Sequence, residues 1–185
     1  MSDLPLRSAE SPSAAHPDTH RGTDGATDSG VYVAPARYGR GVYAARPFAK
    51  GETLLRFTGR RYTGDELDAL GFTPGYPLQV DLDRYVLLDE PHVFCNHSCD
   101  PNGGLTAELE LRAVRDIARD EQISFDYSTT MLEDNSWTLE CGCKSANCRG
   151  LIEDFDHLPE ALQRHLIAEV GVLPFITREL AARGG

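Results

Sequence analysis

The sequence of 185 residues is short of long apolar runs and of positive charge. It has no run of about 18 apolar residues, which a transmembrane helix needs, and its first residues lack the apolar core of a signal peptide. We therefore expect neither membrane insertion nor ordinary secretion, and predict a cytoplasmic protein, or a nuclear one if the source is eukaryotic. The chain has 18 Lys and Arg residues and 29 Asp and Glu residues, which gives a formal net charge of −11. This charge argues against direct nucleic-acid binding and suits a basic protein partner.

Large apolar side chains are almost missing from residues 1–30, which are rich in Ser, Pro, Gly, Ala, Asp and Thr. Such a segment cannot bury enough surface to offset the entropy of ordering, so we predict a disordered tail. The length of the chain suits one domain plus modest tails. We expect a monomer or a weak dimer.

Short strands separated by Gly, Pro and Asp are predicted from residue 31 to about residue 127. The clearest is 105–114, where Leu105, Leu109 and Leu111 alternate with polar residues and would face one side of a sheet. One short helix, 64–70, interrupts the series. The other expected strands are 31–33, 41–44, 53–57, 78–82, 84–88 and 123–127.

A helical pattern replaces the strand pattern near the end of the chain. Pro159 suits the first turn of a helix, Asp156 is available as its cap, and Gly171 ends it. A second short helix is expected over 174–182. The segment 156–185 is thus predicted to be a helical extension that packs on the domain or forms a flap beside the site. The apolar face of its first helix would consist of Leu162, Leu166, Ile167 and Val170.

Three of the five cysteines, Cys141, Cys143 and Cys148, lie within eight residues. In a chain without a secretory signal, this spacing indicates a metal site before it indicates disulfides. Three thiolates in a Gly-containing turn can converge on one tetrahedral zinc ion, which needs a fourth ligand. With four protein ligands, no position remains for water, and the site would be structural. The candidates for the fourth ligand, all from an upstream segment, are Cys95, His97 and Cys99.

Three further segments are rich in groups that bind ligands. In Gly39-Arg40-Gly41 the small residues allow a ligand to approach the backbone, but the strand–helix pattern of a dinucleotide site is missing around them. The segment 96–102, Asn-His-Ser-Cys-Asp-Pro-Asn, concentrates hydrogen-bonding side chains, which a polar turn would also explain. The segment 120–127 ends in Tyr127, and a tyrosine at the end of a strand can equally be a half-buried packing residue.

Taken in order, these segments resemble the motifs of SET-domain protein-lysine methyltransferases that carry a post-SET zinc segment. Residues 39–44 resemble the first cofactor motif of that family, and residues 96–102 match its Asn-His-Ser-Cys-x-Pro-Asn signature. Residues 120–127 resemble its Gly-Glu-Glu-hydrophobic-x-Phe-Asp-Tyr motif. The post-SET pattern, Cys-x-Cys-x4-Cys-Arg-Gly, is matched by residues 141–150.

The resemblance covers about residues 31–154 and implies a mainly β, SET-type fold. Such a fold consists of several small sheets with short helices and a pseudoknot-like threading, to which the C-terminal helices are added here. The implied organisation is a SET domain over 31–130 and a post-SET zinc segment over 137–154.

The resemblance also implies a reaction, the transfer of a methyl group from S-adenosylmethionine to a lysine side-chain amine of a histone-like or other basic protein. Cofactor and peptide would enter from opposite faces, and Tyr127 would be the catalytic residue in the channel between them. Trp137 or Leu139 would lie near the cleft. The implied cofactor-binding residues are Gly39, Arg40, Gly41, Asn96, His97 and Tyr127. The implied ligands of a structural Zn²⁺ are Cys99, Cys141, Cys143 and Cys148.

The chain departs from the family pattern at Phe57, where many members have a tyrosine that lines the substrate channel. The missing hydroxyl keeps a second hypothesis open, in which a catalytically weak SET-fold module binds basic protein tails. Asp120 and Gln122 replace a glycine and a glutamate of the tyrosine motif. The intact Tyr127 and the intact segment 96–102 favour the enzyme.

Overall fold

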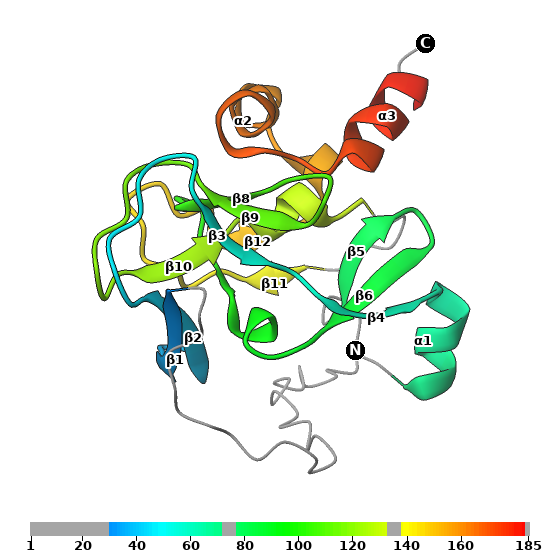
Figure 1. The fold of residues 1–185 in the computed structure, drawn as a ribbon. Coiled ribbons are helices and arrows are strands. Elements are labelled where there is room, and N and C mark those ends of the chain that lie inside the picture. The colour runs from blue at the N-terminus through cyan, green and yellow to red at the C-terminus, as the bar shows by residue number, and fades with distance from the viewer. Residues whose placement is uncertain (1–29, 72–76, 133–137, 184–185) are drawn as a thin grey trace, which may run out of the picture.

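Four small sheets make up most of the fold in the computed structural model, which describes residues 30–71, 77–132 and 138–183 (Figure 1). Their strand orders are β1-β2-β10-β7, β3-β9-β8, β4-β6-β5 and β11-β12. Neighbouring strands are antiparallel except β10 and β7, which are parallel. The strands are β1 (Val31–Pro35), β2 (Arg40–Ala44), β3 (Thr53–Arg56), β4 (Gly59–Tyr62), β5 (Leu78–Asp81), β6 (Arg84–Leu88), β7 (Asn96–His97), β8 (Gly103–Leu105), β9 (Glu110–Ala113), β10 (Gln122–Phe125), β11 (Leu139–Glu140) and β12 (Leu151–Ile152).

The mainly β architecture confirms the predicted fold class, and several expected strands lie close to their predicted bounds. The expected tail lies outside the described residues apart from Gly30, and Trp137 lies outside them as well. The helices of the described part are all too short or too polar to span a bilayer.

Helix α1 (Gly64–Leu70) has the predicted bounds because its ends are specified locally. The Thr63 side chain accepts a hydrogen bond from the Glu66 N–H, and the Glu66 carboxylate accepts one from the Thr63 N–H at 2.8 Å. This capping box satisfies two N–H groups that a helix start leaves free. Gly71 then ends the helix with a left-handed backbone, φ 72°.

The predicted strand over 105–114 is wrong, because the chain reverses within it. β8 and β9 form a hairpin in which Leu105 lies opposite Leu111, and Leu109 adopts a positive φ of 60° in the turn. No Gly, Pro or Asn marks this turn, and the apolar alternation continues through it. On β9 the alternation also fails, because Glu110 is buried as an ion-pair partner of Arg56 and Arg112.

The C-terminal segment consists of the short turn Phe155–His157, helix α2 (Glu160–His165), a π-helical turn (Leu166–Val170) and helix α3 (Pro174–Arg183). Gly171 ends the π-helical turn, as predicted. Two details are corrected. Ile167 is 48% exposed, since the wider π-helical turn changes which side chains face the core. Asp156 accepts a hydrogen bond from Arg183 at 3.1 Å, and its side chain makes no capping bond to α2.

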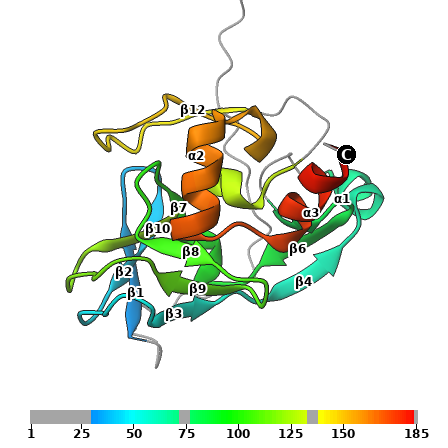
Figure 2. The same ribbon diagram turned by 90° about the horizontal axis from the view of Figure 1, so that it is seen from above.

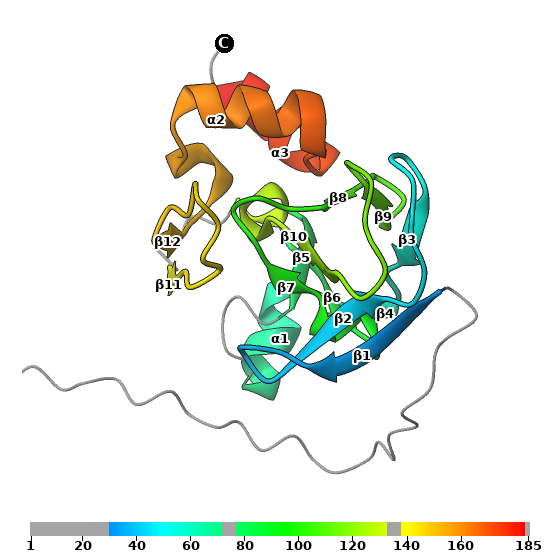
Figure 3. The same cartoon turned by 90° about the vertical axis from the view of Figure 1, so that its left-hand side faces the viewer.

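This segment packs on the sheets and shares their core. Figures 1 and 3 show α2 and α3 on the side of the molecule opposite β1, and Figure 2 shows α2 lying over β8. Phe155 and Ile176 are fully buried together with Val42, Leu111 and Ile123 of the sheets. Burying a side chain of this size contributes about 1.5–3 kcal/mol, so these helices stabilise the domain directly. Of the two expected roles, packing is the one observed.

The contact between β8 and the π-helical turn leaves no room for a side chain at Gly104. A Cβ there would lie 1.7 Å from the carbonyl oxygen of Val170. The backbone of Gly104 does not have a positive φ, so alanine would be conformationally acceptable and only the packing would suffer.

We predict that Gly104→Ala lowers the free energy of unfolding by about 2 kcal/mol or more, because a backbone segment has to move. Gly64→Ala is the matched control, since its Cβ would meet side chains and no backbone, with the Asp83 oxygen at 3.0 Å and the Tyr85 ring at 3.8 Å. The control should change stability by at most about 0.5 kcal/mol. Urea denaturation of both variants measures the difference, and equal stabilities would show that the C-terminal segment does not pack as described.

Candidate functional site

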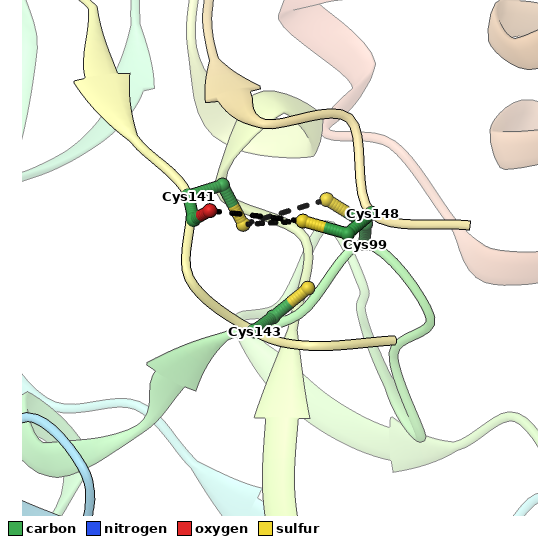
Figure 4. A group of neighbouring side chains, drawn as sticks. All are labelled: Cys99, Cys141, Cys143 and Cys148. Atoms are coloured by element: carbon green, nitrogen blue, oxygen red, sulfur yellow. Dashed lines mark hydrogen bonds between the residues drawn. The ribbon is translucent and has the colours of Figure 1, made fainter. Parts of the chain in front are cut away.

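Four cysteine sulfurs converge where the segment after β11 meets the segment after β7 (Figure 4). The Sγ atoms of Cys99, Cys141, Cys143 and Cys148 all lie within 4.8 Å of one another. The Cys141 sulfur is 3.6 Å from that of Cys99 and 3.7 Å from that of Cys148. Sulfurs bound tetrahedrally to zinc at about 2.3 Å lie about 3.8 Å apart. The donor set and its spacing therefore fit a structural zinc ion.

Of the three upstream residues proposed as fourth ligand, Cys99 is the one within the cluster. Cys95 lies in the apolar core, where burial raises the pKa of its thiol. His97 contacts the cluster from outside, with Nε2 3.3 Å from the Cys99 sulfur.

The cysteine segment is held by the short pair of strands β11 and β12. The Cys141 N–H donates to the Gly150 carbonyl at 2.9 Å, which closes the loop between these strands. Gly142 allows close contact with the β1–β2 turn, because a Cβ at this position would lie 1.8 Å from the hydroxyl oxygen of Tyr38. The loop is thus fixed to both its own strands and the first sheet.

A buried ion pair joins the cysteine segment to the end of β10. Both carboxylate oxygens of Asp126 accept hydrogen bonds from the Arg149 guanidinium, at 2.6 and 2.8 Å, and Asp126 is fully buried. The same carboxylate accepts the Ser128 N–H at 3.1 Å. Removing one partner of such a pair leaves an uncompensated buried charge and costs about 3–5 kcal/mol. Both residues stand in the motifs quoted above, but no sequence signal indicated that they pair.

The His97 side chain is buried between this ion pair, the cysteine cluster and Tyr127. Its Nδ1 accepts the Tyr127 N–H at 3.2 Å, and its ring packs edge-to-face on the Tyr127 ring with centroids 5.3 Å apart. Burial lowers the pKa of His97 to about 4, although the Asp126 carboxylate opposes this shift. The imidazole is therefore neutral at pH 7.

Tyr127 lies at the boundary of two cavities. The small cavity, of about 260 Å³, has apolar walls from Leu78, Leu88, Val93 and Met131, among others. The large cavity, of about 950 Å³, lies between the first sheet and the cysteine segment. Tyr127 lines both, and its hydroxyl donates a hydrogen bond to the Cys95 carbonyl at 3.0 Å. Burial raises the pKa of the Tyr127 phenol, which therefore stays protonated.

The structure brings part of the predicted cofactor set together. Asn96 and His97 line the large cavity with Tyr127, and Leu139 lines it from the cysteine segment. Gly39, Arg40 and Gly41 are not among the residues that line it. Arg40 and Gly41 support it instead, since the Arg40 carbonyl accepts a hydrogen bond from the Asn96 side chain at 2.9 Å and a Cβ on Gly41 would crowd that side chain at 3.2 Å.

Two residues that line the large cavity, Arg37 and Tyr38, were not predicted. They directly precede the predicted motif at Gly39, and that position was the only available signal. Phe57, predicted to line the substrate channel, is buried and does not line the small cavity. It packs behind the wall, with its ring 5.6 Å from that of Phe125 and 5.7 Å from that of His92, and both of these line the cavity.

The central part of the chain matches a known protein family, and the chain is similar to several curated proteins. The family model described as SET domain matches residues 39–128. The chain is 31% identical over 134 residues to a probable histone-lysine N-methyltransferase, set-23, of Caenorhabditis elegans, covering 60% of this chain and 54% of that protein. It is 34% identical over 108 residues to the H3 lysine-9 specific histone-lysine N-methyltransferase dim-5 of Neurospora crassa, covering 48% of this chain and 31% of that protein.

A third relative is the H3 lysine-4 specific histone-lysine N-methyltransferase of Saccharomyces cerevisiae, 26% identical over 140 residues. That match covers 66% of this chain and 13% of the yeast protein. The chain thus spans between 13% and 54% of the length of these curated relatives.

We predict that the purified protein contains about one zinc ion per chain and that Cys143→Ser loses it, because three thiolates hold the ion far less well than four. Cys95→Ala is the control, since this cysteine lies outside the cluster, and it should keep the ion. Elemental analysis of the three proteins gives the metal content. A wild-type protein without zinc, or a Cys143→Ser variant that keeps a full equivalent, would contradict the assignment.

Proposed function

We propose that this protein, whose residues 39–128 are a SET domain, is an S-adenosylmethionine-dependent protein-lysine N-methyltransferase. It transfers a methyl group to the lysine side-chain amine of a basic protein, histone-like or other. The observation that carries this proposal is the position of Tyr127, the one predicted catalytic residue, at the boundary of a large and a small cavity.

The large cavity has the properties of the cofactor site. Its volume of about 950 Å³ lies within the usual range for small-molecule sites. Asn96, His97, Arg37 and Tyr38 would hold the cofactor against the first sheet, and the cysteine segment would form the opposite wall. S-adenosylmethionine, when bound, supplies a methyl carbon on a cationic sulfur, which keeps the electron pair of the carbon–sulfur bond when a lysine nitrogen takes the methyl group.

The small cavity has the properties of the lysine channel. Only a neutral amine has the lone pair that forms the new nitrogen–carbon bond, and a free lysine has a pKa of about 10.4. Deprotonating it at pH 7 costs about 4–5 kcal/mol, and its proton goes to solvent. Apolar walls disfavour the ammonium form and lower this cost. None of the described residues that line the small cavity is acidic, so none of them stabilises the ammonium as a carboxylate would.

The Tyr127 hydroxyl would orient the amine at the junction of the two cavities. Its proton is already donated to the Cys95 carbonyl, which leaves the oxygen as an acceptor for an N–H of the neutral amine. Since burial raises the pKa of the phenol, Tyr127 does not act as a base at neutral pH. Its contribution is therefore orientation and electrostatic stabilisation in the transition state.

The zinc ion would have a structural role at the cofactor site. Cys141, Gly142 and Cys143 line the large cavity, so the ion that orders these residues also orders one wall of that cavity. Four cysteine ligands leave it no open position for water or substrate.

A basic substrate follows from charge and from the relatives. The formal net charge of −11 favours association with lysine-rich proteins. The names of two of these relatives give histone H3 as their substrate. The absence of nucleic-acid binding and the monomeric or weakly dimeric state stay predictions.

We predict that Tyr127→Phe lowers the single-turnover rate of methyl transfer about 30- to 1000-fold, which corresponds to about 2–4 kcal/mol of transition-state stabilisation. Affinity for the cofactor, measured by calorimetry, should change much less, because the hydroxyl acts mainly in the transition state. Tyr43→Phe is the matched control. Its hydroxyl donates to the Pro35 carbonyl and lines neither cavity.

The substrate for this assay is a mixture of basic proteins with a methyl-labelled cofactor. A stable Tyr127→Phe variant whose rate stays within threefold of wild type would refute the role of Tyr127. Saturable cofactor binding by the wild type without formation of S-adenosylhomocysteine would support the binding module instead.

We also predict that Phe57→Tyr shifts the products towards monomethyl-lysine. Phe57 packs behind Phe125 and His92 of the channel wall, so an added hydroxyl would push these side chains towards the channel and leave less room for an already methylated amine. Mass spectrometry of the product lysine gives the distribution, and the melting temperature controls for damage to the fold. An active variant with an unchanged distribution would show that Phe57 has no influence on the channel.

A further inference from the structure

One side chain, His97, contacts both the cysteine cluster and the residue assigned to catalysis. Nε2 lies 3.3 Å from the Cys99 sulfur, and Nδ1 lies 3.2 Å from the Tyr127 backbone nitrogen. The side chain is only 6% exposed, so water does not compete strongly for either contact.

The hydrogen bonds determine which ring nitrogen carries the proton. A backbone N–H can only donate, so Nδ1, which receives the Tyr127 N–H, is the unprotonated nitrogen. Nε2 therefore carries the hydrogen and donates it to the Cys99 sulfur. A sulfur that binds a metal is a thiolate, which accepts a hydrogen bond more strongly than a thiol does.

The Asp126 carboxylate leaves this arrangement undisturbed. It lies 3.5 Å from Nδ1, but its oxygens are already engaged by Arg149 and by the Ser128 N–H. Arg149 also donates its backbone N–H to the Cys99 sulfur, at 3.4 Å. Two chains of hydrogen bonds thus start at the Cys99 sulfur. One runs through Arg149 to Asp126 and the other through His97 to Tyr127, the next residue in the sequence.

We propose that His97 is a positioning residue that couples the metal site to Tyr127. Charge on the Cys99 sulfur, present when the metal is bound, orients the imidazole through Nε2–H, and Nδ1 in turn holds the backbone of Tyr127. Metal loss weakens the first bond and releases the second. The catalytic meaning of this coupling rests on the proposed function, whereas the coupling itself concerns only hydrogen bonds and the metal.

Two substitutions separate the two ends of the imidazole. His97→Asn keeps an acceptor for the Tyr127 N–H, near the position of Nδ1, and loses the donor to Cys99. His97→Gln keeps a donor that reaches Cys99, near the position of Nε2, and loses the acceptor for Tyr127. Zinc affinity is measured by competition with a chromophoric chelator, and the Tyr127 amide is observed by ¹H–¹⁵N NMR.

In the wild type, removal of zinc should shift the Tyr127 amide resonance. His97→Asn should weaken zinc binding about 10- to 100-fold, the usual effect of losing a group that contacts a metal ligand. His97→Gln should bind zinc within about threefold of wild type, with the Tyr127 amide displaced even when zinc is bound. Wild-type zinc affinity in His97→Asn, or a wild-type Tyr127 resonance in zinc-bound His97→Gln, would overturn the proposal.

A wild-type measurement keeps the test valid if a variant does not fold. Imidazole ¹⁵N spectra at neutral pH should show His97 protonated at Nε2 only, with a resonance that moves when zinc is removed. The opposite tautomer, or no response to zinc, would also overturn the proposal. None of these measurements uses methyl transfer, so failure of the coupling and failure of the proposed function give different results.

Discussion

Three contacts with Cys95 and His97 fix the position of Tyr127, which lines both cavities. Its hydroxyl donates to the Cys95 carbonyl, its backbone N–H donates to His97, and its ring packs edge-to-face on the His97 ring. A tyrosine fixed in this way can separate two cavities without closing either. The surrounding sheets matter for function mainly because they bring these partners to one place.

The partners come from distant parts of the chain, and buried polar contacts keep them together. The parallel pairing of β7 with β10 sets Asn96 and His97 beside the strand that leads to Tyr127. The Asp126–Arg149 pair then ties the cysteine segment to the end of the same strand. Because these groups are buried, removing either partner of a pair would leave the other unsatisfied. The site is therefore stabilised by groups that also give it its shape.

The sequence predicted those features that neighbouring residues specify. The ends of α1 follow from Thr63, Glu66 and Gly71, which lie within or beside the helix. The hairpin of β8 and β9 was missed, because Leu109 adopts a positive φ in the turn and leucine is not a residue type that predicts one. The motifs located Tyr127, but the cavities arise where distant segments meet, and no local pattern encodes them.

The division of the site at Tyr127 is tested most directly by backbone NMR titration of the zinc-bound protein with two ligands in turn. S-adenosylhomocysteine, which lacks the transferable methyl group, should shift amide resonances in 96–97 and 138–143. A lysine-rich histone-tail peptide, added to that complex, should shift amide resonances in 78–79 and 92–95, the other side of Tyr127. Displacement of the first ligand by the peptide, or shifts of both ligands confined to the same cavity, would contradict the account.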